Sequence, residues 1–184
     1  MPREKLLSQN NAMLLVVDIQ DAFMAHIPKI EQVIERSRII IEAAKLLELP
    51  LVVTEQYPQG LGRTNDNVQK VLGDVKYHDK VAFSCMQDEA IKSAITRTHR
   101  RQVIIIGIET HVCISQTAHD LLAAGLQPHV MADAVASRRK IDHKTALRRM
   151  PYAGIIVSTT EAAVFELMVS SKHKVFREIS NLVK

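Results

Sequence analysis

The sequence contains no tryptophan, and aromatic residues make up only 4% of its 184 positions. Single-stranded nucleic acids are commonly bound by stacking of bases on aromatic side chains, so no base-stacking surface is expected. The two cysteines, Cys85 and Cys113, are too few for the disulfide framework of a small secreted protein. No apolar run is long enough to span a membrane, and the polar segment before residue 12 differs from a signal peptide. We therefore expect a cytoplasmic protein without a membrane or nucleic-acid partner.

Signatures of nucleotide binding and of several domains are also missing. The chain has neither Gly-x-Gly-x-x-Gly nor Gly-x-x-x-x-Gly-Lys, so no dinucleotide or nucleoside triphosphate cofactor is expected. No linker, repeat or low-complexity segment interrupts the chain, and its length predicts a single domain over residues 1–184. Basic residues are spread out apart from Arg138-Arg139-Lys140, so we interpret the net charge of +4 as surface charge that aids solubility.

Strand-like and helix-like segments alternate along the whole chain. Short runs rich in Val, Ile and Leu predict strands, and apolar residues at helical spacing predict helices. The expected strands are residues 12–17, 51–54, 80–83, 102–108, 128–131 and 154–158, with Asp133 just beyond the fifth. The expected helices are residues 30–49, 68–72, 88–98, 113–124, 143–150 and 160–169, the fifth capped by Asp142. This alternation predicts an α/β fold with three layers, α/β/α, in which a Rossmann-like, mostly parallel sheet carries helices on both faces.

Cys113 lies between a predicted buried strand and the helix that follows it. Ligands of such sheets bind at the carboxyl ends of the strands. A thiol at the amino end of a helix lies near unpaired N–H groups that favour the thiolate. We therefore expect a lowered pKa and a nucleophilic role for Cys113. The alternative is that Cys113 is a small buried apolar residue.

Asp18 and Lys80 are the residues expected to assist the thiol. Asp18 closes the first strand directly after four apolar residues, although a helix cap or a solvated turn is the alternative role. Lys80 stands before Val-Ala-Phe, where a lysine taken alone is more often solvated. Taken together, the Asp supplies a base, the Lys a cation and the Cys a nucleophile.

Three segments carry a resemblance to a known family. They are Leu-Leu-Val-Val-Asp-Ile-Gln-Asp at 14–21, Lys80 followed by Phe83-Ser84, and Gly-Ile-Glu-Thr-His-Val-Cys-Ile at 107–114. In combination, and over nearly the whole length, the chain resembles the cysteine hydrolases of the isochorismatase-like superfamily. Residues 54–62, Thr-Glu-Gln-Tyr-Pro-Gln-Gly-Leu-Gly, further resemble the isochorismatase-domain-containing branch.

The resemblance implies a catalytic triad of Asp18, Lys80 and Cys113. It also implies a non-proline cis peptide between Ile108 and Glu109, which turns the Glu109 N–H toward the Cys113 N–H and forms an oxyanion hole. The implied reaction is attack by sulfur on a small amide or related acyl carbon, formation of a thioester, and hydrolysis by water. Family resemblance also suggests a homo-oligomer.

The resemblance is incomplete at the position of a metal. Nicotinamidase members of the family resemble one another in an Asp-x-His metal motif after the second strand. The corresponding residues here are Thr54-Glu55-Gln56-Tyr57, and the next histidine is His78, so no metal is expected. Members that cleave the vinyl ether of isochorismate generally lack the cysteine, so Cys113 argues against that reaction.

Four further residues are candidates for contact with a substrate: Phe23, Gln56, Tyr57 and His111. For each of them a packing or surface role is the alternative. Cys85 is expected to be buried rather than reactive.

Two other classes of function stay open beside the hydrolase. One is a non-catalytic interaction protein that keeps the fold, and the other is a redox-active thiol protein, because a cysteine of low pKa is also oxidisable.

Overall fold

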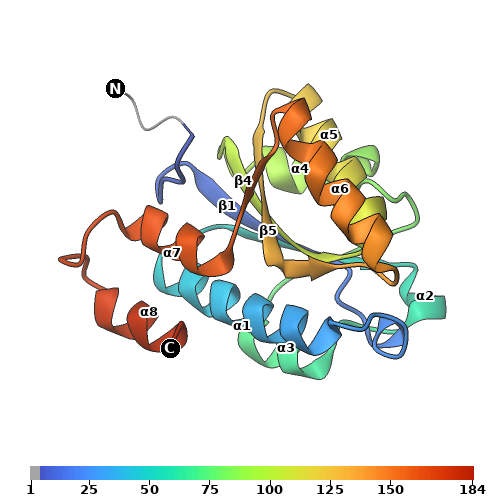
Figure 1. Ribbon diagram of the computed structural model, residues 1–184, viewed down its shortest axis with the longest axis horizontal. Coiled ribbons are helices and arrows are strands. Elements are labelled where there is room, and N and C mark those ends of the chain that lie inside the picture. The colour runs from blue at the N-terminus through green and yellow to red at the C-terminus, as the bar shows by residue number, and fades with distance from the viewer. Residues whose placement is uncertain (1–4) are drawn as a thin grey trace.

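The computed structural model of the protein describes residues 5–184, so residues 1–4 of the expected domain lie outside the described part. Within that part, six strands form one parallel sheet in the order β3-β2-β1-β4-β5-β6 (Figure 1). The strands are β1 (Ala12–Val17), β2 (Leu51–Gln56), β3 (Tyr77–Lys80), β4 (Gln102–Ile108), β5 (Gln127–Ala136) and β6 (Ile156–Ser158). The expected three-layer α/β/α fold is confirmed.

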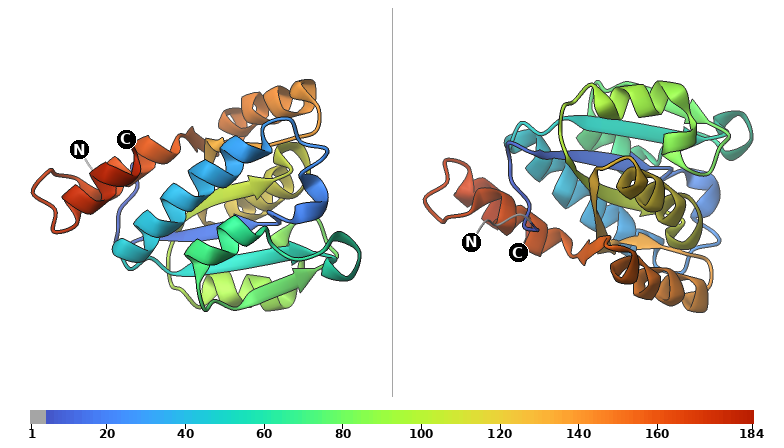
Figure 2. Two further views of the ribbon diagram at one scale, coloured as in Figure 1. Left: turned by 90° about the horizontal axis from the view of Figure 1, so that it is seen from below. Right: turned by 90° about the horizontal axis from the view of Figure 1, so that it is seen from above.

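Helices cover both faces of this sheet (Figures 1 and 2). The helices packed on one face are α1 (Ile30–Leu46), α3 (Asp66–Leu72), α7 (Thr160–Met168) and α8 (Phe176–Leu182). The helices packed on the other face are α4 (Glu89–Thr96), α5 (Ser115–Ala123) and α6 (Lys140–Ala153). The short helix α2 (Pro58–Leu61) and two 3-10 turns (Asp21–Phe23 and Cys85–Gln87) lie in loops, and a π-helical turn (Thr110–Ile114) precedes α5. No helix of the described chain is long and apolar enough to cross a membrane.

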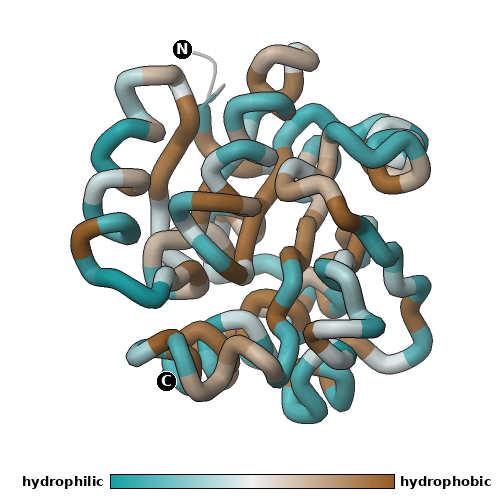
Figure 3. The backbone as a smooth tube through the Cα atoms, turned by 90° about the vertical axis from the view of Figure 1, so that its right-hand side faces the viewer, coloured by the Kyte–Doolittle hydropathy of each residue, from teal (hydrophilic) through white to brown (hydrophobic). Residues whose placement is uncertain are grey.

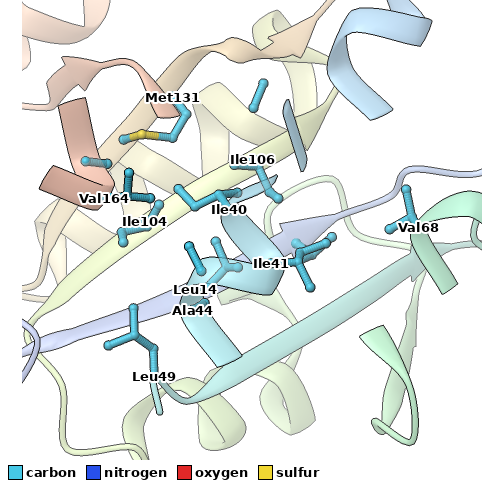
Figure 4. Close-up of a cluster of buried hydrophobic side chains, with 14 of the residues drawn as sticks. Leu14, Ile40, Ile41, Ala44, Leu49, Val68, Ile104, Ile106, Met131 and Val164 are labelled. Carbon is cyan, nitrogen blue, oxygen red and sulfur yellow. The ribbon is translucent and has the colours of Figure 1, made fainter. Parts of the chain in front are cut away.

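The two apolar cores follow from the alternation of side chains along the strands. In β1, Leu14 and Val16 face the core under α1, whereas Met13, Leu15 and Val17 face the core under α4 and α5. Figure 4 shows the first core, where Ile40 and Ile41 of α1 lie over Leu14 and Ile104. Figure 3 shows apolar segments concentrated along the central strands and polar ones on the outer turns. Because the central strands are buried on both faces, they are continuous apolar runs.

The order of the strands reverses between β1 and β4. Such a switch point leaves a crevice at the carboxyl ends of the two strands. Gly107 near the end of β4 has φ 119°, and a Cβ there would lie 1.9 Å from the Val17 carbonyl oxygen. A glycine is therefore required where β4 approaches the end of β1, directly beside Asp18.

Several expected boundaries differ from the structure. Lys80 is the last residue of β3, not the first residue of a strand over 80–83. The sequence carries no apolar signal for this strand because Tyr77-His78-Asp79 is polar, as the exposed edge of a sheet allows. Lys80 thus lies at a carboxyl end, as Asp18 does. The helix expected over residues 30–49 ends earlier, at Leu46. Two residues later, Glu48 takes a positive φ of 56°, so the chain has left the helix before it reaches Pro50.

The carboxyl-terminal third shows three more differences. Strand β5 continues past Met131 to Ala136, so Asp133 is inside the strand, and its carboxylate accepts a hydrogen bond of 2.8 Å from the Thr160 amide at the start of α7. Helix α6 begins at Lys140, so Asp142 belongs to its first turn and does not cap it. The last helix, α8, is not among the expected elements.

Candidate functional site

Asp18 is held at the switch point between β1 and β4. It follows the last residue of β1 and has φ 54°, a left-handed conformation that Asp tolerates better than most residues. Its side chain is 1% exposed. The Thr54 hydroxyl on β2 donates a hydrogen bond of 2.7 Å to Asp18 Oδ1, which leaves Oδ2 facing Lys80. The carboxylate is therefore fixed in orientation by a neighbouring strand.

Lys80 crosses from the edge strand β3 to reach this carboxylate. Its Nζ lies 2.7 Å from Asp18 Oδ2 and donates to Gln56 Oε1 at 2.6 Å, and its side chain is fully buried. The carbonyl oxygens of Ala82 and Phe83 lie 3.2 and 3.3 Å from the same nitrogen. Burial lowers the pKa of Lys80, but Asp18, Cys113 and Cys85 together raise it by more, so the pKa lies above its ordinary value. The ammonium is a permanent positive charge in the site.

Cys113 completes a cluster of three side chains from distant parts of the chain. Its Sγ lies 3.7 Å from Lys80 Nζ, and the residue is 7% exposed. It belongs to the π-helical turn that leads from β4 into α5, so the thiol lies at the amino end of a helical segment, as expected. The structure thus brings Asp18, Lys80 and Cys113 together.

The expected lowering of the thiol pKa is wrong for this arrangement. Burial and the Asp18 carboxylate raise the pKa of Cys113 to about 12, although Lys80 acts in the opposite direction. The amino end of the helix and one ammonium group do not compensate for burying a thiolate beside the Asp18 carboxylate. The raised pKa favours the neutral thiol over the thiolate at neutral pH.

Gln56, a candidate for substrate contact, has partners inside the protein for both ends of its amide. Its oxygen accepts from Lys80, and its nitrogen donates to the Val81 carbonyl oxygen at 2.8 Å. Its backbone N–H also donates to Gln20 Oε1 at 2.7 Å. These contacts make Gln56 a residue that positions Lys80.

The other three candidates for substrate contact lie in different surroundings. Phe23 is half-buried and packs against the core under α1. Tyr57 is 52% exposed, and its backbone N–H donates to the Lys80 carbonyl oxygen at 2.8 Å, so its ring stands at the surface beside the end of β3. His111 Nδ1 lies 3.0 Å from Ser137 Oγ, which ties the turn before Cys113 to the end of β5.

Hydrogen bonds of its side chains fix the loop between β4 and Cys113. The peptide between Ile108 and Glu109 is cis. The Glu109 carboxylate accepts from the Arg138 backbone N–H at 2.9 Å and from Arg138 Nε at 3.1 Å. Thr110 Oγ1 lies 3.0 Å from His143 Nδ1 on α6. The side chain of Glu109 therefore points to the β5–α6 loop, and only its main chain is available for a role beside Cys113.

Sequence reasoning did not identify Thr54, Gln20 or Arg138 as parts of this region. Thr54 and Gln20 each lie inside the quoted segments, but no pattern in one strand tells which side chain of the next strand it will meet. Arg138 belongs to a basic run, whose ordinary meaning is a solvated face. The second cysteine, Cys85, is fully buried as expected, with Sγ 4.0 Å from Thr54 Oγ1.

Among residues 5–184, no group of three or more His, Cys, Asp or Glu side chains is placed to hold a metal ion. His78 lies on β3 opposite Thr54, and burial lowers its pKa.

Comparisons of the sequence with known proteins give matches over most of the chain. The family model of the isochorismatase domain matches residues 12–162. Isochorismatase domain-containing protein 2 of Danio rerio is 36% identical over 177 residues, which are 96% of this chain and 89% of that protein.

Two solved structures show the same fold. The structure described as MAR1 ribonuclease from Caenorhabditis elegans superposes with a TM-score of 0.91 at 38% identity, covering 97% of this chain and 92% of that one. The Escherichia coli YcaC gene product, described as an octameric hydrolase of unknown specificity, has a TM-score of 0.88 at 22% identity, covering 100% of this chain and 97% of that one, and shows the fold alone. On the match to the family model and to the Danio rerio protein, the chain belongs to the isochorismatase domain family.

Proposed function

We propose that this protein is a cysteine hydrolase that cleaves a small amide or related acyl compound through a thioester on Cys113. Membership of the isochorismatase family supports hydrolytic chemistry. The observation that carries the finer proposal is the buried cluster in which Lys80 Nζ lies 2.7 Å from Asp18 Oδ2 and 3.7 Å from Cys113 Sγ. A nucleophile, a base and a cation within one crevice are the parts that covalent acyl transfer requires.

The neutral resting thiol defines the first step of the proposed mechanism. As Sγ attacks the acyl carbon, the thiol proton passes to Asp18, and the electron pair of the carbonyl moves to its oxygen. The main-chain N–H groups of Glu109 and Cys113 stabilise that oxygen, a contribution of about 2.7–4 kcal/mol per donor in known oxyanion holes. Protonated Asp18 then gives its proton to the leaving amine as the thioester forms.

Hydrolysis of the thioester reverses the roles of the same groups. Asp18 accepts a proton from water while the water oxygen attacks the thioester carbon, and the proton returns to the departing sulfur. Lys80 stays protonated throughout, because its ammonium stabilises the carboxylate when the thiol is neutral and the sulfur when the proton is on Asp18. No step uses a metal or another cofactor.

The test is a panel of small amides incubated with the protein and followed by intact-mass spectrometry. The expected result is product release together with a transient acyl adduct that peptide mapping assigns to Cys113. The Cys113→Ala variant is expected to give neither product nor adduct, and Cys85→Ala is expected to give both. Turnover that survives in Cys113→Ala refutes the proposal.

The same panel includes a short single-stranded RNA, because the Caenorhabditis elegans structure is described as a ribonuclease. We expect no cleavage of the RNA by this chain. In the proposed reaction the thiol attacks an acyl carbon, whereas in RNA cleavage by transfer to a neighbouring hydroxyl the nucleophile is that hydroxyl and no thiol is needed. Cleavage that is lost in Cys113→Ala assigns the cluster to phosphodiester chemistry instead. Prolonged dialysis against a chelator is expected to leave amide turnover unchanged.

The proposed working form is a homo-oligomer in a reducing compartment such as the cytoplasm. The catalytic thiol must stay reduced, and both cysteines of the described chain are free thiols. The Escherichia coli YcaC structure, which has the same fold, is described as octameric. Light scattering after size-exclusion chromatography is expected to give a mass that is a multiple of 20.7 kDa, and a mass of one chain contradicts this part.

A further inference from the structure

A second hollow lies at the carboxyl edge of the sheet, beyond the loop that carries Cys113. It has a volume of about 710 Å³ and lies between the segment just before α1, the end of β5 and one side of α6. The left view of Figure 2 shows α6, in orange, beside the blue segment that leads into α1. None of the three residues of the proposed catalytic cluster lines it.

Every charged side chain that lines this hollow, which we call the α6 groove, carries a positive charge. Lys140, Lys144 and Arg148 are four residues apart and so lie on one side of α6, and Lys29 faces them from the segment before α1. None of these four forms an ion pair with any residue of 5–184. A hollow lined by charges of one sign concentrates a positive potential, which attracts an anion.

The rest of the groove wall is largely apolar. Pro28, Ile141 and Leu147 line it together with the Ala136 methyl group, and Ile141 is 64% exposed. A free inorganic anion would leave these side chains in contact with water. A ligand that fits both the cations and the apolar wall of the groove has an anionic head and an apolar body.

His143 supplies a directional polar group to the same groove. Its Nδ1 lies 3.0 Å from the Thr110 hydroxyl, which is in the turn that carries Cys113. When the Thr110 hydroxyl donates to Nδ1, the proton of the neutral ring is on Nε2, which then serves as a donor. Burial and the nearby Lys29 ammonium lower the pKa of His143, so the neutral ring is the favoured form.

We propose that the α6 groove is a binding site for a small anionic amphipathic molecule, one with a carboxylate or phosphate head and an alkyl or aryl body. The head lies among Lys29, Lys144 and Arg148, and the body lies along Ile141 and Leu147. The site is distinct from the Cys113 crevice and is joined to it by the Thr110–His143 hydrogen bond. It does not depend on the proposed hydrolysis.

Isothermal titration of the full-length chain with octanoate and with octyl phosphate tests this site. Octyltrimethylammonium and octyl glucoside have the same alkyl body with a cationic and an uncharged head. We expect saturable binding of an anionic compound at one site, at least about tenfold tighter than either of these congeners. The tighter of octanoate and octyl phosphate identifies the head group. The titration is repeated with Cys113→Ala, where binding is expected to persist whether or not the hydrolase proposal holds.

Charge reversal on α6 is the decisive variant. Lys144→Glu with Arg148→Glu is expected to weaken binding of the anion by at least about tenfold. Lys172→Glu with Arg177→Glu makes the same change in net charge on exposed residues elsewhere and is expected to leave the affinity unaltered. Ile141→Gln, at an exposed position that the fold tolerates, is expected to weaken octyl compounds while the preference for an anionic head remains.

Three outcomes overturn the proposal. Equal affinity for the cationic and anionic congeners shows that the four cations do not select the head group of the ligand. Equal loss in the control pair shows an unspecific effect of net charge. A short RNA that competes for the groove at lower concentration than any octyl compound assigns the surface to nucleic acid instead.

Discussion

At the scale of single residues, the chemistry of the site depends on how Asp18 shares its two oxygens. Oδ1 accepts from Thr54, and Oδ2 pairs with Lys80. A buried ion pair of this kind contributes little net stability, because desolvation of both charges offsets their attraction. Its effect is on reactivity, since the negative charge keeps the neighbouring thiol protonated.

The first prediction concerns Asp18→Asn, which separates thiol acidity from catalysis. Loss of the negative charge removes one cause of the raised pKa of Cys113, so the midpoint of its alkylation by iodoacetamide moves to lower pH. At neutral pH the variant is therefore alkylated faster than the wild type, whereas turnover falls by about 100-fold or more because the base is gone. Rates of labelling across pH, assigned to Cys113 or Cys85 by peptide mapping, measure the first effect.

Asp74→Asn, a change at an exposed carboxylate, is the control and is expected to alter neither rate. An alkylation midpoint that moves to higher pH in Asp18→Asn is incompatible with the geometry described above. Labelling of Cys85 before Cys113 is equally incompatible, because Cys85 is completely buried and Cys113 is 7% exposed.

The second prediction concerns Thr54, a positioning residue. Thr54→Val keeps the shape of the side chain but leaves Asp18 Oδ1 without its buried donor, at a cost of about 1–3 kcal/mol in the free energy of unfolding. We expect kcat to fall more than KM changes, since the carboxylate loses its orientation. Thr54→Ser restores the donor and is expected to recover most of kcat. A loss of kcat in Thr54→Ser as large as in Thr54→Val shows that packing, and not the hydrogen bond, is what matters.

At the scale of secondary-structure elements, three strand ends and one turn bring the site together. Asp18 follows β1, Thr54 and Gln56 lie at the end of β2, Lys80 ends β3, and Cys113 follows β4. In a parallel sheet all these ends share one edge, so residues up to about 95 positions apart meet without any special loop. The close approach of β1 and β4 at this edge depends on Gly107.

The third prediction tests that approach. Gly107→Ala places a methyl group against the Val17 carbonyl oxygen at a φ of 119°, so we expect a loss of about 3 kcal/mol or more in the free energy of unfolding by urea. Gly125→Ala is the matched control, because Gly125 also has a positive φ, 78°, but nothing lies within 4 Å of the added carbon. Its cost is expected to be about 1–2 kcal/mol. Equal losses in the two variants contradict the close contact between β4 and β1.

At the scale of the whole molecule, two buried polar side chains among residues 5–184, Ser37 and His129, have no hydrogen-bond partner, and only the histidine can titrate. His129 on β5 is fully buried, and neither ring nitrogen has a hydrogen-bond partner among the described residues. By the alternation of the strand it lies on the same face as Met131, toward α1 and α7. Burial lowers the pKa of His129 to about 4.

The fourth prediction follows from this histidine. The unfolded chain takes up a proton at His129 near pH 6.5, whereas the folded chain does so only near pH 4. Because the unfolded state binds more protons in this interval, stability falls as the pH falls from 6.5 to about 4, by about 3 kcal/mol from this residue.

The measurement is urea unfolding at several pH values in that interval. His129→Leu is expected to flatten the dependence by about the same 3 kcal/mol, since the leucine fills the site without titrating. His26→Gln, at an exposed histidine, is expected to leave the slope as it is in the wild type. An unchanged slope in His129→Leu means that another group is responsible for acid sensitivity.

The sequence by itself determined the layered architecture and the positions of Asp18 and Cys113 at strand ends. Periodicity is a local property, and the four apolar residues before Asp18 and the four β-branched residues before Gly107 leave little choice but a buried strand. The polar edge strand β3 and the helix α8 carry no such pattern, because a partly exposed element needs no continuous apolar face. Their place was decided by what they pack against.

Only the tertiary structure decided the chemistry within that frame. The pKa of Cys113 depends on its burial and on its distance to Asp18, and both are set by residues far apart in sequence. Reasoning from the helix end alone therefore predicts the wrong direction of the pKa shift. The contacts of the Gln56 amide with Lys80 and Val81 also depend on the packed sheet. So does the α6 groove, whose four cations come from two segments more than 100 residues apart. Hydrogen bonds and charges act over a few ångströms, and only the packed sheet determines which side chains come that close.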